Sequence, residues 1–152
     1  MNSDLAAVRR SWVVFFVAYL GALVAYGVVA LLAHQAASRV LSPNVRELLR
    51  TILPGLAAVC IAASIVSLPR SLVRIAVPPH LFLRRTIIAL TLAEGSAVAG
   101  LAGILLGVFS VANYAFSGLA AALVMVLWIL PRGNAYWRLQ RNDRHSVPRE
   151  YS

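Results

Sequence analysis

The residues from Thr86 to Val108, TIIALTLAEGSAVAGLAGILLGV, form a stretch of 23 residues with no basic side chain and one acidic side chain, Glu94. At about 1.5 Å per residue, a helix of this length spans the hydrocarbon core of a bilayer, which is roughly 30 Å thick. A carboxyl group at that depth is costly unless it is protonated, hydrogen-bonded or facing a polar path. The stretch therefore predicts a transmembrane helix with one unusual residue near its middle.

Three more apolar runs, at residues 11–33, 51–68 and 115–130, have the character of membrane spans. The composition agrees, because 61% of the residues are hydrophobic, 12% are charged and the mean hydropathy is +0.80. Soluble domains are more polar than this. The sequence predicts an all-α fold in one domain: a four-helix transmembrane bundle at residues 11–130, between a short polar head at 1–10 and a basic tail at 131–152.

Two connections contain signals of their own. Ser42-Pro43 is an N-cap and first-turn pair, so a helix is expected to start there, before the membrane is reached. The segment 71–85 mixes apolar residues with arginine and is interrupted by Pro78-Pro79. It is too interrupted to span and too apolar for open water, and we expect it to lie in the headgroup layer.

All 14 basic residues are arginines, and they stand at the ends of the apolar runs. With four spans, eleven arginines fall on the side of the two termini, and three fall on the other side, namely Arg39, Arg46 and Arg50. Cytoplasmic loops carry an excess of basic residues, so both termini are predicted to be cytoplasmic, in the cell inner (plasma) membrane. This topology explains the net charge of +9 better than binding to nucleic acid does, and we expect no nucleic-acid partner.

Basic and aromatic side chains near the span ends also predict contact with the lipid bilayer and its anionic lipids. A frayed polar tail explains the C-terminal residues equally well. The candidates for lipid or anion contact are Arg84, Arg85, Arg132, Arg138 and Trp137.

The two halves of the chain begin and end alike. An Arg-Arg pair precedes Ser11 and Thr86, and Leu-Pro-Arg closes each half at residues 68–70 and 130–132. Tyr19 and Glu94 each lie nine residues beyond the second arginine, which places both about 13 Å along a helix. Two parallel hairpin repeats would produce this pattern. The positive-inside bias alone would also put arginines at these four ends.

Small residues recur every fourth position in the third span, at Gly95, Ala99, Gly103 and Gly107. Such a ridge allows another helix to approach closely, which matters in lipid because no hydrophobic force drives helices together there. We expect the first or fourth span of the same chain to cover the ridge. A second copy or a foreign membrane subunit is the alternative.

Glu94 lies one residue before this ridge. Desolvation favours the neutral form of a carboxyl group, so we expect Glu94 to be protonated near neutral pH unless water reaches it. As a structural group it would hydrogen-bond to a neighbour, with Tyr19, Tyr26, Thr91 and Ser96 as candidates. As a functional group it would bind and release a proton or a cation. The sequence leaves both roles open.

Leu92-Ala93-Glu94-Gly95, followed by the apolar residues 98–106, resembles the glutamate-bearing helix of the rotary ATPase proteolipids. Four spans arranged as two hairpins resemble the V-type form of that family. The resemblance covers this helix and the gross architecture, and it implies that Glu94 is an ion-binding carboxylate. A four-span chain with one membrane acid is also similar to small multidrug transporters.

Conventional catalysis finds little support in the sequence. His34, His80 and His145 lie in three separate polar segments, Cys60 is the one cysteine, and no metal, nucleotide or nucleophile motif occurs. We expect no enzyme, no cofactor and no metal site. The predicted function is that of a small polytopic integral membrane protein, a non-enzymatic accessory or structural subunit acting through helix packing and a basic cytoplasmic face. The alternative is a proton- or cation-coupled carrier, or a proteolipid-like subunit, that uses Glu94.

Overall fold

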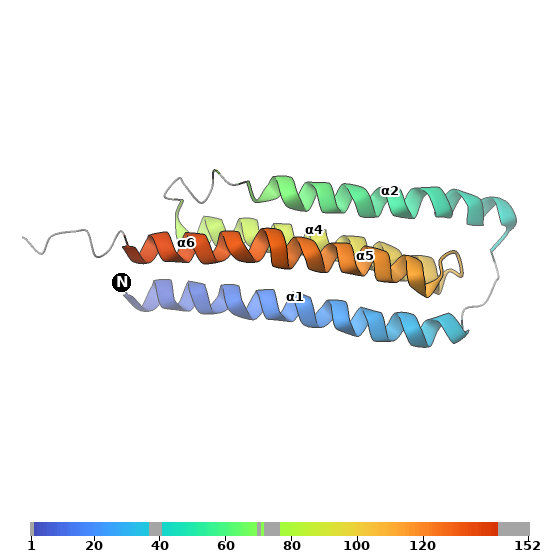
Figure 1. Ribbon diagram of the computed structural model, residues 1–152, viewed down its shortest axis with the longest axis horizontal. Coiled ribbons are helices and arrows are strands. Elements are labelled where there is room, and N and C mark those ends of the chain that lie inside the picture. The colour runs from blue at the N-terminus through green and yellow to red at the C-terminus, as the bar shows by residue number, and fades with distance from the viewer. Residues whose placement is uncertain (1, 37–40, 70, 72–76, 143–152) are drawn as a thin grey trace, which may run out of the picture.

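The computed structural model describes residues 2–36, 41–69, 71 and 77–142, and within them the fold is all-α. Residues 111–142 form one continuous helical segment, so the bundle consists of four long helical segments (Figure 1). The predicted four-helix bundle is confirmed. Its elements are α1 (Asn2–Ala36), α2 (Pro43–Ser67), α4 (Pro79–Leu105), α5 (Val111–Leu123), the π-helical η1 (Val124–Ile129) and α6 (Leu130–Asn142).

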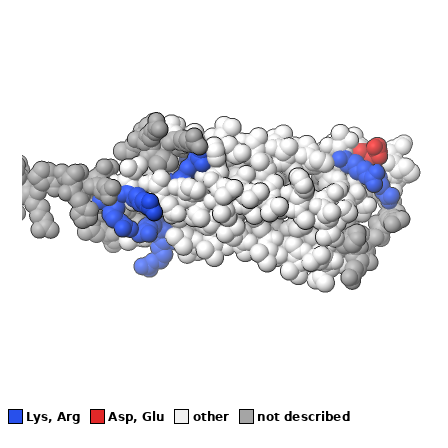
Figure 2. Space-filling model, viewed as in Figure 1, with Lys and Arg blue, Asp and Glu red and all other residues white. Residues whose placement is uncertain are grey.

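In the described part of the chain, four helical segments are long and apolar enough to cross a membrane: Leu5–Ala33, Pro43–Ser67, Pro79–Leu105 and Val111–Arg141. Large apolar side chains cover the outside of the bundle, including Val24, Leu32 and Phe116. Figure 2 shows charged side chains at both ends of the molecule and a broad uncharged band between them. An apolar belt of this kind is what lipid requires. The four helices fit a small integral membrane protein.

Helix α4 is the centre of the bundle, because it packs against α1, α2 and α5, whereas α1 and α2 are not among the helix pairs that pack. In Figure 1, α1 and α2 lie at opposite edges, with α4 and the α5–α6 helix between them. Helices α4 and α5 do pack against each other. The two halves are therefore unequal in their packing, and the duplication stays a prediction from the sequence.

The two ends of the bundle differ in charge. One end, here called the Arg-rich end, contains the starts of α1 and α4 and the ends of α2 and α6 (Figure 1). Its described arginines are Arg9, Arg10, Arg84, Arg85, Arg132, Arg138 and Arg141. The opposite end, here called the far end, has Arg46 and Arg50 together with Glu47. Arg39, Arg70, Arg74, Arg144 and Arg149 lie outside the described residues. Which end faces the cytoplasm stays a prediction.

Two helices begin earlier than the apolar runs suggest. Helix α1 starts at Asn2 and includes the polar head, since Leu5 and Val8 pack against the core. Helix α4 starts at Pro79 rather than Thr86, so residues 79–85 are part of that helix, and their place in the headgroup layer stays a prediction. Proline is tolerated in a first helical turn, where its missing N–H has no partner to lose. Residues 72–76 lie outside the described residues. As predicted, α2 begins at Pro43 with Ser42 as its N-cap.

The fourth crossing continues beyond the predicted end at residue 130, through Pro131 to Asn142, so part of the predicted tail is helical. A proline ring inside an α-helix collides with the carbonyl four residues earlier. Here η1 precedes Pro131, and the N–H of Leu130 donates to the carbonyl of Met125, five residues back. This wider turn makes room for the proline, and the helix continues. Residues 143–152 lie outside the described part.

Helix α4 ends in a tight turn at Gly107, which has a φ of 65° in the left-handed region that favours glycine. The N–H of Gly107 donates to the carbonyl of Ile104, and the N–H of Val108 donates to the carbonyl of Gly103. This pair of bonds is a Schellman motif. Gly107 therefore ends the helix, and it is not a fourth member of the predicted ridge.

Candidate functional site

Glu94 lies within the central helix α4, far from both of its ends. It is 15 residues from Pro79 and 11 from Leu105, or about 22 Å and about 16 Å along the axis. Its side chain is half-buried beside α1. The carboxyl group thus sits at mid-depth of a predicted span but is not enclosed by the bundle.

A tyrosine of α1 supports this carboxyl group. The hydroxyl of Tyr26 donates a hydrogen bond to Oε1 of Glu94 over 2.7 Å. Hydrogen bonds between helices in a membrane contribute about 0.6 kcal/mol on average and up to about 1.7 kcal/mol. In the described part of the chain, no second hydrogen bond to Glu94 is found. The bond joins α1 to α4 and offsets part of the desolvation of Glu94.

A second pair lies on the same interface, closer to the Arg-rich end. The hydroxyls of Tyr19 and Thr91 lie 2.6 Å apart, and either can donate. Counting from the arginine pairs puts Tyr19 at the depth of Glu94, but Tyr19 bonds to Thr91, one turn earlier, and Tyr26 reaches the acid. We call Tyr19, Tyr26, Thr91 and Glu94 the polar seam.

Ser96, the remaining candidate, lies on another face of α4. Its side chain is fully buried, and its Oγ lies 2.9 Å from the carbonyl oxygen of Ala93 and 3.5 Å from that of Ser117 in α5. Side chains two positions apart in a helix, such as Glu94 and Ser96, point about 200° apart around its axis. Ser96 therefore stabilises the contact with α5 and is not a partner of Glu94.

The polar seam borders a face of α4 that the bundle leaves uncovered. Thr91 is exposed, and Val98 and Leu105 are 45% and 53% exposed. Residues seven apart share a helix face, so these three side chains form one strip, which we call the open face of α4. Helices α1 and α2 flank α4 and, in the part of the chain that the structure describes, do not form a packed pair with each other. The open face is therefore accessible from the side, at the depth where lipid or another helix would lie.

The predicted ridge does not have one partner. A Cβ at Gly95 would lie 3.3 Å from Sγ of Cys60 in α2, while one at Gly103 would overlap the ring of Phe109, just after α4. Ala99 is buried, with 4% of its surface exposed. The expectation that the first or fourth span covers the ridge is wrong for Gly95, which faces the second span. Among the glycines of α4, Gly100 is the one that lies against the fourth span, because a Cβ there would overlap Ser117 of α5. The four-residue spacing of the ridge does not include Gly100 and so did not predict this contact.

Aromatic side chains that the sequence did not group together pack at the Arg-rich end. The rings of Phe82 and Tyr136 stack with centroids 3.9 Å apart, and Trp137 meets Phe82 edge-on at 6.0 Å. Trp12 stacks on Phe16 at 5.8 Å. Trp137 is only 6% exposed. Its predicted contact with lipid headgroups is wrong, because its ring packs within the bundle.

The four arginines predicted to contact lipid behave differently from one another. Arg84, Arg85 and Arg138 are exposed at the Arg-rich end. Arg132 is 7% exposed, donates from Nη1 to the carbonyl of Trp128 over 2.8 Å, and lies with its guanidinium 3.3 Å from the centre of the Trp128 ring. A cation over an aromatic face is held by the ring quadrupole. Arg132 therefore points back onto its own helix and not to the headgroup layer.

Among the residues that the structure describes, no group of three or more histidine, cysteine or acidic side chains could hold a metal ion. The polar seam is thus the candidate functional site, with one acid, two phenols and one hydroxyl. It can accept or donate hydrogen bonds within the membrane, and Glu94 can exchange a proton. Comparison of the chain with protein-family models, curated proteins and solved structures gives no match.

Proposed function

We propose that this protein is a non-enzymatic accessory subunit of a membrane assembly, and that it binds a transmembrane helix of its partner on the open face of α4. One observation carries the proposal: Thr91 and half-buried Glu94 lie beside exposed Val98 in the middle part of α4. Polar side chains in a bilayer usually face protein or water. A partner helix on this face would cover them.

The hydrogen bonding of Glu94 supports a partner helix that covers its side chain. The bond from Tyr26 occupies Oε1, and no bond to Oε2 is found within the described residues. A side chain of a second helix could accept a hydrogen bond from the carboxyl group or donate one to it, and the helix would exclude lipid from Thr91. The partner is either a foreign membrane subunit or a second copy of the chain.

The exposed arginines support the same function at the membrane surface. Arg84, Arg85 and Arg138 lie together at the Arg-rich end, where each would add about 1 kcal/mol of attraction to anionic lipids. With this end in the cytoplasm, both termini are cytoplasmic and the protein belongs to the plasma membrane. Anionic lipids and an acidic surface of the partner are then its contacts outside the hydrocarbon core.

Photo-crosslinking in intact membranes tests this function. A photoreactive amino acid at Val98 on the open face should give one discrete crosslinked product. The same amino acid at Leu119, which is 60% exposed on α5, serves as the matched control and should give only lipid adducts. Equal products from both positions, or only lipid adducts from Val98, would refute the proposal.

A proton- or cation-coupled carrier is the second candidate, favoured by the 2.7 Å bond between Tyr26 and a half-buried acid. Glu94→Gln separates the two functions, because an amide keeps the acceptor but cannot release a proton. A carrier loses proton uptake into proteoliposomes and loses carbodiimide labelling, whereas an accessory subunit keeps its Val98 crosslink and takes up no protons above empty liposomes. Glu47→Gln, an exposed acid at the far end, is the control.

A further inference from the structure

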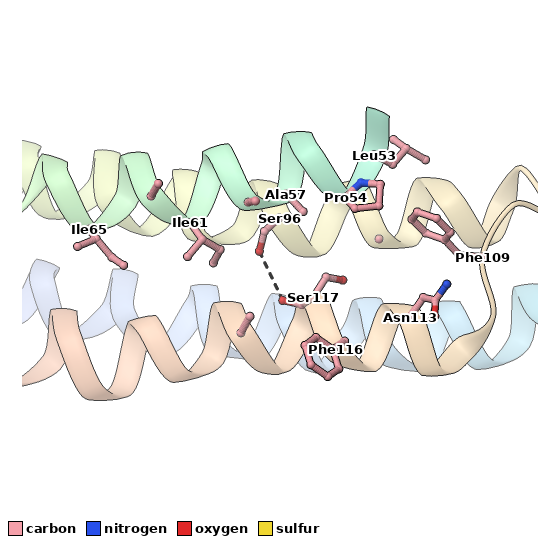
Figure 3. A pocket seen from close by; sticks show the side chains of 14 residues that line it. Leu53, Pro54, Ala57, Ile61, Ile65, Ser96, Phe109, Asn113, Phe116 and Ser117 are labelled. Carbon is pink, nitrogen blue, oxygen red and sulfur yellow. Dashed lines mark hydrogen bonds between the residues drawn. The ribbon is translucent and has the colours of Figure 1, made fainter. Parts of the chain in front are cut away.

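An apolar groove lies between α2 and α5, on a different side of α4 from the polar seam. It has a volume of about 670 Å³, with Ala57, Ala58 and Ile61 of α2 on one wall and Phe116 of α5 on the other. Gly100 of α4 forms part of its floor. Figure 3 shows these walls, with the contact between Ser96 and Ser117 crossing the floor. Because α2 and α5 hardly contact each other, the groove opens to the side of the bundle.

The dimensions of the groove suit a hydrocarbon chain better than a helix. Its α2 wall runs from Leu53 to Ile65, twelve residues or about 18 Å, which is close to one bilayer leaflet of about 15 Å. Sites for small ligands have volumes of about 300–1,000 Å³. A membrane helix about 10 Å wide and 30 Å long has a volume of about 2,400 Å³, so it could lie over the opening of the groove but would not fit within it.

In the deeper part of the groove, the polar side chains of the lining already have hydrogen-bond partners within the protein. The hydroxyl of Ser117 donates to the carbonyl of Tyr114 over 3.0 Å, and that of Ser96 donates to Ala93. Both hydroxyls are satisfied within the protein, so hydrocarbon can lie against them without loss. Asn113 differs: its exposed side chain lies toward the far-end mouth, near Phe109 (Figure 3). A polar group is thus available only where a lipid headgroup would be.

Two cations lie above this mouth on the groove side of α2. Arg50 and Arg46 precede Pro54, a groove residue, by four and eight residues, so they share its helix face. Nε of Arg46 is buried and has no hydrogen-bond partner within the described residues. Glu47 lies on the same face, leaving a net charge of +1 for the three side chains. Figure 2 shows a patch of basic and acidic side chains at the end of the molecule where α2 starts.

We propose that the groove binds one acyl chain of an anionic phospholipid from the far-end leaflet, with its phosphate held by Arg50 and Arg46 and its polar backbone contacted by Asn113. The single negative charge of a phosphodiester matches the net charge of the mouth. The site also gives a reason for the two described arginines at the far end, where the positive-inside bias predicts few basic residues. It is separate from the open face of α4 and does not depend on the role of Glu94.

Native mass spectrometry of the full chain in mild detergent tests the site. The probes are dioleoyl phosphatidylglycerol and dioleoyl phosphatidylcholine at equal concentration, which share their chains and differ in headgroup charge. We expect one retained phosphatidylglycerol, favoured at least fivefold over phosphatidylcholine. Arg50→Gln should weaken its retention about fivefold, while Arg9→Gln, an exposed arginine of α1 at the Arg-rich end, should not. Ala58→Phe fills the groove and should abolish retention, whereas Val59→Phe, on the outer face of α2, should not.

Several results would overturn the proposal. Equal retention of both lipids by the unmodified chain refutes the charged mouth, and equal loss in Arg50→Gln and Arg9→Gln refutes its location. Retention that survives Ala58→Phe places the chain elsewhere. A dimer of the unmodified protein that Ala58→Phe separates assigns the groove to a second copy of the chain instead. Equal retention of the two lipids by the unmodified chain overturns the proposal even if a variant fails to fold.

Discussion

The hydrogen bond between Tyr26 and Glu94 predicts a measurable energetic coupling between α1 and α4. Tyr26→Phe removes only the hydroxyl, and Glu94→Leu removes the acceptor at similar size. The bond is 2.7 Å long, and Glu94 has no other hydrogen bond in the described residues, so the loss should lie in the upper part of the range for membrane proteins. We expect Tyr26→Phe to lower the free energy of unfolding by about 1–1.7 kcal/mol.

A double-mutant cycle separates this bond from other effects of the two substitutions. Once Glu94→Leu is present, Tyr26→Phe should lower stability by little, because the hydroxyl has lost its acceptor. Unfolding by sodium dodecyl sulfate in mixed micelles, followed by tryptophan fluorescence, gives all four stabilities. Tyr19→Phe is the matched control, since that hydroxyl bonds to Thr91 and should not couple to Glu94. A Tyr26–Glu94 coupling below about 0.3 kcal/mol, or an equal coupling for Tyr19, would refute the assigned contact.

Two further predictions use the same unfolding assay, each with a matched control. Gly133→Ala should destabilise the protein by about 1–3 kcal/mol because a Cβ would overlap the buried ring of Trp12, while Gly21→Ala, with nothing within 4 Å, should be neutral or stabilising; equal effects would show that Trp12 does not pack on Gly133. Ser64→Ala should cost about 0.6–1.7 kcal/mol through its lost 2.7 Å bond to α4, and Ser67→Ala, which bonds within α2, should cost less; the reverse order would contradict the α2–α4 contact.

The sequence predicted the number and type of the helices because apolar length is a strong signal in membrane proteins. It failed at boundaries set by proline. In the sequence, Pro78-Pro79 suggests an interruption and Pro131 suggests a helix end. In the structure, Pro78-Pro79 starts α4, and Pro131 lies inside a continuous helix after a π-helical segment. Proline forbids an ordinary helical hydrogen bond, but it does not forbid a first turn or a widened one.

The arrangement of the helices was harder to predict than their existence. In water, the contrast between polar and apolar faces tells which side of a helix is covered, but lipid-facing and packed residues here are equally apolar. The ridge spacing correctly drew attention to α4, although the tightest contact with α5 is at Gly100 and not on the ridge. The partner of Glu94 also depends on the offset between α1 and α4, which residue counting could not supply.

Within the described residues, α1 and α2 do not form a packed pair, and this bears on the order of assembly. During synthesis these two helices emerge before α4, and in the finished fold neither provides a docking surface for the other. We expect each of these helices to reach its final position only after α4 has been inserted between them. We therefore expect a chain that stops after Ser67 to leave α1 and α2 without a fixed arrangement, which only the C-terminal half would supply.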